Sequence, residues 1–224
     1  MNLEYSIVYS ARKTLQISVE RDRSVIVRAP EGTPHNKIED AVESKKLWLY
    51  EKLKNPQKYK ETSHSTELVS GTSLLYLGKE YRLDFVGDIF DGVVFESKFL
   101  ISRRARMMAA ELLKGWYIES ARCIIRPKVK LHARHLGVEY NQVLISDLKY
   151  RWGSCTPKNN LNFNWRLVKA PMSVIEYVII HELTHLLEPN HTPRFWSIVK
   201  TQLPNYARSK EWLKNYGDLL ESRI

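Results

Sequence analysis

Three histidines and a glutamate near the end of the chain have a spacing that suits metal chemistry. His181 and His185 are four residues apart, and His191 follows six residues later. On a helix, positions i and i+4 lie on one face, so the first two imidazoles can reach a single ion. Glu182, beside the first ligand, can accept a proton from a water molecule on the open side of that ion. The pattern predicts one catalytic zinc ion with three protein ligands and a fourth position left for water.

The third ligand has alternatives. Pro189 disfavours helical geometry at the residue before it, so we expect the chain to turn there and bring His191 back toward the metal. Glu188, in the turn, and Glu211, on a later predicted helix, are carboxylates that could take the same place. We favour His191, because imidazole suits zinc and the connecting turn is short.

A buried helix is expected to carry the first two histidines. Large aliphatic residues occupy more than one face of the segment that follows Pro171, and Ser173 with Glu176 three residues later predicts a capping box. Histidine and glutamate side chains within such a segment would be buried and would need partners. Burial therefore favours a metal site over surface histidines.

Motifs between residues 150 and 206 extend this picture. They are RWGSC at 151–155, LNFNWRL at 161–167 and HTPRFW at 191–196. Together with the metal helix they resemble the YgjP-like zinc metallopeptidase family and, more distantly, SprT-type and other zincin proteases. The resemblance implies an α+β, zincin-like fold, hydrolysis of peptide bonds in a peptide or protein substrate, and zinc as cofactor. It also implies that His181, His185 and His191 bind the zinc and that Glu182 is the general base.

Residues around the metal helix suggest how a peptide could bind. A predicted strand before that helix continues into Trp152, Gly153 and Ser154. An extended peptide could add to the edge of this strand, with Gly153 permitting close approach of the backbone and Trp152 forming a wall. Packing of Trp152 in the core is an equally good explanation for that residue. Tyr206, after the site, could donate a hydrogen bond to a developing oxyanion.

The order of predicted elements indicates two parts. Residues 1–100 are expected to form a β-rich part with one helix, and residues 101–224 the zincin-like metallopeptidase domain. Alternating apolar residues predict a hairpin over 15–27, and the apolar pattern of 36–54 predicts a helix. The polar stretch 58–66 is a candidate linker.

A second helical region precedes the metal motif. The pattern is helical from Arg103 to Leu136, where Pro127 is expected to divide it into two helices and Gly137 to cap the second one. His132 and His135 share this region, but no acidic or cysteine partner stands beside them in the sequence. We expect them to be surface residues.

Composition limits the class of protein. The 224 residues are 43% hydrophobic, enough for a real core, and no apolar run approaches the length of a membrane span. The N-terminus lacks the charged-then-apolar order of a signal peptide. Cys123 and Cys155 give no disulfide framework, so we expect a cytoplasmic protein with no membrane partner. Nothing in the sequence indicates an oligomeric state.

Positive charge raises an alternative function. Lysine and arginine number 35 against 25 acidic residues, a formal net charge of +10. This charge could steer the protein to DNA or RNA, either as a protease that acts on nucleic-acid-bound proteins, by analogy with SprT-type proteases, or as a non-proteolytic binding module. A solvated basic face is the commoner explanation of the same residues. The basic residues of the middle helices are Arg103, Arg104, Arg106, Arg122, Arg126, Lys128, Lys130 and Arg134.

Overall fold

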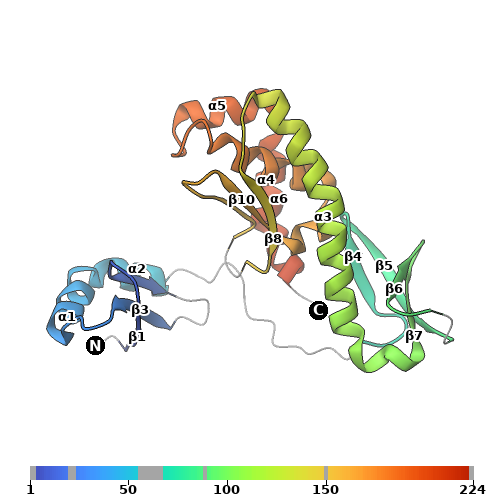
Figure 1. Ribbon diagram of the computed structural model, residues 1–224, viewed down its shortest axis with the longest axis horizontal. Coiled ribbons are helices and arrows are strands. Elements are labelled where there is room, and N and C mark those ends of the chain that lie inside the picture. Colours follow the sequence, from blue (N-terminus) through green and yellow to red (C-terminus); the bar gives the residue numbers. More distant parts are fainter. Residues whose placement is uncertain (1–3, 20–23, 55–67, 88–89, 149–150, 222–224) are drawn as a thin grey trace. The chain divides into compact units, whose positions relative to one another are not determined.

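The chain divides into two compact units (Figure 1). A computed structural model describes residues 4–19, 24–54, 68–87, 90–148 and 151–221. The units are Met1–Ser63 and His64–Ile224. The predicted boundary between residues 100 and 101 falls inside a strand of the second unit, and the predicted linker at 58–66 lies outside the described residues.

The first unit is a three-stranded sheet with two helices. Its elements are β1 (Ser6–Ser10), β2 (Gln16–Val19), β3 (Val25–Pro30), α1 (His35–Ser44) and α2 (Lys46–Lys54). The strand order is β1-β3-β2, and the antiparallel pairing of β2 with β3 confirms the predicted hairpin. Buried residues of β3 pack with Ile38, Val42 and Leu49 of the helices. The single helix expected over 36–54 is two helices, interrupted at Lys45.

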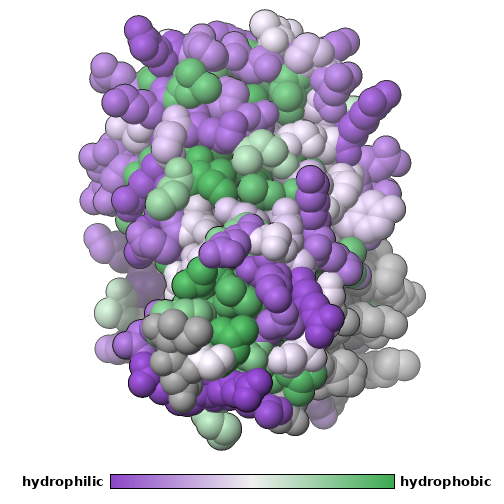
Figure 2. Space-filling view, turned by 90° about the vertical axis from the view of Figure 1, so that its right-hand side faces the viewer, coloured by the Kyte–Doolittle hydropathy of each residue, from purple (hydrophilic) through white to green (hydrophobic). Residues whose placement is uncertain are grey.

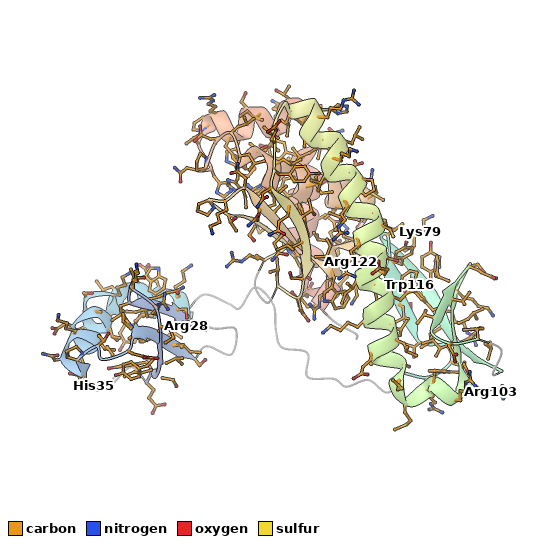
Figure 3. The ribbon with its side chains drawn as sticks, viewed as in Figure 1. Arg28, His35, Lys79, Arg103, Trp116 and Arg122 are labelled. Carbon is orange, nitrogen blue, oxygen red and sulfur yellow. The ribbon has the colours of Figure 1, made fainter. Side chains whose placement is uncertain are left out.

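The second unit begins with a sheet that shares its core with a long helix. The elements are β4 (Ser73–Tyr76), β5 (Lys79–Val86), β6 (Val93–Phe95), β7 (Phe99–Ser102), the 3-10 helix η1 (Arg103–Met108) and α3 (Ala109–Leu136). The sheet order is β4-β5-β7-β6. Trp116 of α3 (Figure 3) packs against Phe95 and Phe99, with ring centroids 5.4 and 4.9 Å apart. Figure 2 shows that hydrophilic side chains on this side of the molecule alternate with smaller apolar patches.

Helix α3 runs through Pro127 without a break, so the expected division into two helices is wrong. Its buried residues recur every four positions on both sides of the proline: Ala109, Leu113, Tyr117, Ala121, Ile125, Val129 and Ala133. Pro127 lies on the exposed side, and so does Cys123, whose carbonyl loses its helical partner and can bind water instead. Packing of the buried stripe outweighs the cost of about 3 kcal/mol that proline imposes in a helix. Gly137 ends the helix at φ 65°, as predicted.

The remaining elements surround one central helix. They are β8 (Gln142–Ser146), β9 (Gly153–Cys155), β10 (Asn160–Asn164), the 3-10 helix η2 (Trp165–Lys169), α4 (Met172–Thr184), α5 (Pro193–Gln202) and α6 (Tyr206–Glu221). The sheet order is β8-β10-β9, which leaves β9 at an edge. Helix α4 packs against α3, α5, α6 and β9. The molecule therefore has the α+β class expected from the sequence.

The starts of α5 and α4 differ in how they are capped. Thr192 caps α5 as its hydroxyl oxygen accepts a hydrogen bond from the Phe195 N–H at 3.3 Å. The capping box predicted for α4 is absent, since no side chain caps that helix and the Glu176 carboxylate accepts a hydrogen bond from Lys128 Nζ instead.

A lysine is buried within this unit. Lys169 Nζ donates to the carbonyl oxygen of Leu220 near the end of α6 at 3.2 Å.

None of the helices in the described ranges is long and apolar enough to cross a membrane.

Candidate metal centre

The central helix places two imidazoles on one side. His181 lies in the last turn of α4, and His185 is the residue that ends it, still in right-handed helical geometry at φ −63° and ψ −18°. Their ring centroids are 5.0 Å apart. This is the arrangement expected for residues i and i+4 of a helix.

A short connection returns the third imidazole to the same point. Nε2 of His191 lies 3.0 Å from Nε2 of His181, and the His191 ring centroid is 4.8 Å from that of His185. Ligand nitrogens of the three residues all lie within 4.8 Å of one another. Two nitrogens bound to one tetrahedral zinc would be about 3.3 Å apart, so the spacing fits such an ion. Neither Glu188 nor Glu211 belongs to this group.

Two of the imidazoles, those of His181 and His185, are held toward the neutral form that metal ligands require. Burial, with the charges of His185, His191 and Lys210, lowers the pKa of His181 to about 3. Burial also lowers the pKa of His185, whose Nδ1 lies 3.3 Å from the carbonyl oxygen of Glu188. If Nδ1 carries the proton and donates it to that carbonyl, Nε2 keeps its lone pair for a metal.

Glu182 is buried beside the three histidines. Its side chain is 6% exposed, and the backbone N–H of Cys155 in β9 donates to its carboxylate. Burial raises the pKa of this carboxyl group to about 7, although the charge of Arg151 and the Cys155 hydrogen bond oppose the shift. The group can therefore exchange a proton near neutral pH.

Gly153 makes the close approach of β9 to Glu182 possible. A Cβ atom on Gly153 would lie 2.6 Å from Cγ and 2.7 Å from Oε1 of Glu182. Any residue with a Cβ would therefore displace either the strand or the carboxylate.

Comparison with known proteins assigns the chain to a family. Residues 13–216 match the family described as YgjP-like, metallopeptidase domain. The chain belongs to the YgjP-like metallopeptidase family. A crystal structure of the metallopeptidase zymogen of Pyrococcus abyssi abylysin is 21% identical, with a TM-score of 0.39, over 45% of this chain and 98% of that one. A comparison with curated proteins gives no match. The YgjP-like chain is thus a metallopeptidase, a class that implies a bound metal ion.

The other predicted site residues of this YgjP-like chain differ in what they contact. Trp152 is half-buried and packs against the hydrophobic core. Ser154 pairs with Asn162 in the sheet, and Gly153 contacts Glu182. The Tyr206 ring stacks on Trp196 at 5.5 Å and on Tyr177 at 6.3 Å.

Sequence reasoning missed two neighbours of the YgjP-like site. Tyr177 packs with its ring centroid 5.8 Å from that of His181, and burial raises its pKa to about 12. Its place four residues before His181 on α4 could have indicated this contact. Lys210, whose Nζ lies 4.1 Å from the ring centroid of Trp196, comes from α6, and no local pattern connects it with the metal motif.

Proposed function

We propose that the protein is a zinc-dependent peptidase in which His181, His185 and His191 hold the ion and Glu182 is the general base. The convergence of the three imidazole nitrogens, next in sequence to a buried carboxyl group, carries the proposal. A set of three imidazole ligands suits zinc and leaves room for a further ligand. When bound, zinc would supply a Lewis acid and lower the pKa of a water molecule toward neutrality.

Glu182 moves the proton in this proposal. As the oxygen of water attacks the carbonyl carbon of the scissile peptide bond, the carboxylate accepts the proton that the water loses. Glu182 then donates this proton to the amide nitrogen while the C–N bond breaks. Burial favours the protonated form of this carboxyl group, so it can hold the proton between the two steps, and the Cys155 N–H fixes its orientation.

The substrate is proposed to bind along β9. This strand lies at the edge of its sheet, and Gly153 brings it against Glu182. An extended peptide that pairs with the segment from Trp152 to Ser154 would have its backbone beside the general base. Tyr206 is proposed to donate a hydrogen bond to the oxyanion that forms on the attacked carbonyl.

Metal content and peptide cleavage together test the function. Glu182→Gln should keep zinc, because the histidines remain, and lose at least about 10²-fold in kcat/KM on a mixed peptide library read by mass spectrometry. His191→Ala should lose zinc in elemental analysis. Glu211→Gln is the matched control and should keep both zinc and turnover. Full turnover by metal-loaded Glu182→Gln, or loss of zinc only in Glu211→Gln, would overturn these roles.

Nucleic-acid binding is a second candidate, supported by one face of α3. Arg126, Lys130 and Arg134 are exposed at four-residue spacing, and none of them forms an ion pair within the described ranges. Arg122 (Figure 3), one turn earlier, pairs with Glu119. Anisotropy titrations with duplex and single-stranded DNA should show salt-dependent binding that weakens when the three exposed residues are replaced by Gln. If the variant bound DNA as tightly as wild type, this face of α3 would not be the nucleic-acid-binding surface.

The cytoplasm is the compartment that we propose. Both cysteines, Cys123 and Cys155, are free, and we propose the reducing cytoplasm as the site of action.

A further inference from the structure

Helix α6 places one of its faces beside the third histidine through Trp196. The Trp196 indole stacks on the His191 imidazole, with centroids 5.6 Å apart and planes 21° apart. Two residues of α6 contact the same indole. The Tyr206 ring is stacked on it at 5.5 Å, and Nζ of Lys210 lies 4.1 Å from its ring centroid. Tyr206 and Lys210 are four residues apart on α6 and therefore share a face.

The charge of Lys210 is fixed in place but not neutralised. Lys210 is exposed, and no carboxylate pairs with it in the part of the chain that the structure describes. A contact between an ammonium group and an indole holds the cation by the ring's quadrupole and leaves its full charge available to another group. This charge lies close to the three histidines, because the Trp196 indole that it contacts is stacked on the His191 imidazole.

A fixed cation beside a metal ion favours an anion in the space next to both. The ammonium group and a divalent ion repel one another, and a carboxylate close to them would be attracted by each. Arg151, which acts electrostatically on Glu182, adds a second positive charge near the site. The charges at the site thus favour an acidic ligand.

We propose that Lys210 is a specificity-determining residue that selects a substrate carboxylate next to the scissile bond. This inference rests on the proposed peptidase function. The carboxylate belongs to an aspartate or glutamate side chain or to a free C-terminus, which offer the same chemistry. Trp196 keeps the Lys210 ammonium group near His191, and the substrate carboxylate binds to that group.

Binding can be measured without turnover in the zinc-loaded full-length Glu182→Gln protein. Peptide pairs that differ by Glu against Gln, Asp against Asn, or a C-terminal carboxylate against its amide would be compared by calorimetry. We expect tighter binding of the acidic member by about threefold to tenfold. The pair that shows the effect identifies the source of the carboxylate.

Variants of α6 separate Lys210 from general charge. Adding Lys210→Met should abolish the preference for acidic peptides, while Lys210→Arg should keep it. Lys214→Met removes the same charge from an exposed position one turn further along α6 and should keep the preference. Elemental analysis should give equal zinc in all of these variants. A merely structural role of Lys210 would instead lower the zinc content, or would weaken the binding of both peptides of a pair alike.

The possible results decide both proposals separately. An unchanged preference in Lys210→Met, an equal loss in Lys214→Met, or no preference for any acidic peptide would overturn the role of Lys210. If acidic peptides bind through Lys210 but the wild-type protein cleaves none of them, the peptidase function fails and the anion site stands. If wild type cleaves peptides with no charge preference, the peptidase function stands and the role of Lys210 fails.

Discussion

Replacement of Gly153 by alanine tests whether β9 sets the position of Glu182, the proposed general base. The new Cβ would lie 2.6 Å from Cγ, 2.7 Å from Oε1 and 2.9 Å from Cδ of Glu182. Non-bonded carbon atoms prefer a separation of about 3.5 to 4.0 Å, so the overlap is about 1 Å. Glu182 is 6% exposed and has little space in which to move. We expect its carboxylate to shift by about the size of the overlap.

The size of that shift sets the expected loss. A misplacement of about 1 Å at a reacting group costs about 10²-fold in rate, equivalent to about 2.7 kcal/mol in the barrier. Gly153→Ala should therefore lower kcat/KM by about that factor. Overpacking should also lower the free energy of unfolding by about 1 to 3 kcal/mol. The zinc content should remain, because the three atoms nearest to the new methyl group all belong to Glu182 and not to a histidine.

The assay combines peptide kinetics at pH 7, elemental analysis and urea denaturation. Gly115→Ala is the matched control, because a Cβ at that exposed position of α3 meets no atom within 4 Å. It should leave turnover unchanged and stabilise the helix by about 0.5 to 1 kcal/mol. A shift of about 1 Å should cost more than about threefold in kcat/KM. If metal-loaded Gly153→Ala keeps kcat/KM within about threefold of the wild-type value, the contact between Gly153 and Glu182 does not position the carboxylate.

Other substitutions test the surroundings of the site and the core. Burial lowers the pKa of Lys169 from 10.5 to about 7, so between these values the unfolded chain binds more protons than the folded protein. The stability of wild type relative to Lys169→Met should therefore rise with pH across that window in urea denaturation. Gly78→Ala should destabilise by at least about 2 kcal/mol, since φ is +79° and the Cβ would lie 2.7 Å from Cγ of Pro171. Trp196→Ala, which removes the ring stacked on His191, should weaken zinc binding by about tenfold in chelator competition.

Each of these has its own control or contrary result. A pH-independent difference between wild type and Lys169→Met would show that Lys169 stays charged in the folded protein. Gly71→Ala carries a similar backbone strain at φ +97° with no atom within 4 Å of its Cβ, so it should cost less than the Gly78 change. Trp196→Phe should keep most of the zinc affinity, and an equal loss in both variants would contradict the stacking argument.

Local periodicity was sufficient where one helix or hairpin decides the outcome. The spacing of His181 and His185 predicted their shared face, and the alternation of apolar residues over 15–27 predicted the hairpin of β2 and β3. These features depend on a few neighbouring residues, whose geometry is fixed by the helix or the hairpin itself. The turn at Pro189 was likewise enough to predict that His191 comes back to the first two imidazoles.

Tertiary contacts decided the rest. Pro127 was expected to break α3, but the buried stripe on the opposite side keeps the helix intact. Glu176 was expected in a capping box, but Lys128 of another helix binds its carboxylate. The contact of Lys210 with Trp196 joins two helices that share no sequence pattern. Such pairings depend on how elements pack, which propensity and spacing do not describe.

The order of exposure among the three imidazoles bears on how the protein acquires its ion. His181 and His185 are half-buried, whereas His191 is exposed and lies on the short connection between α4 and α5. With His191 as the proposed third ligand, an arriving ion would meet its imidazole first from solvent. A bound ion could be released when that imidazole moves away while α4 keeps its shape. Occupancy would then follow exchange with the metal buffers of the surroundings instead of entrapment during folding.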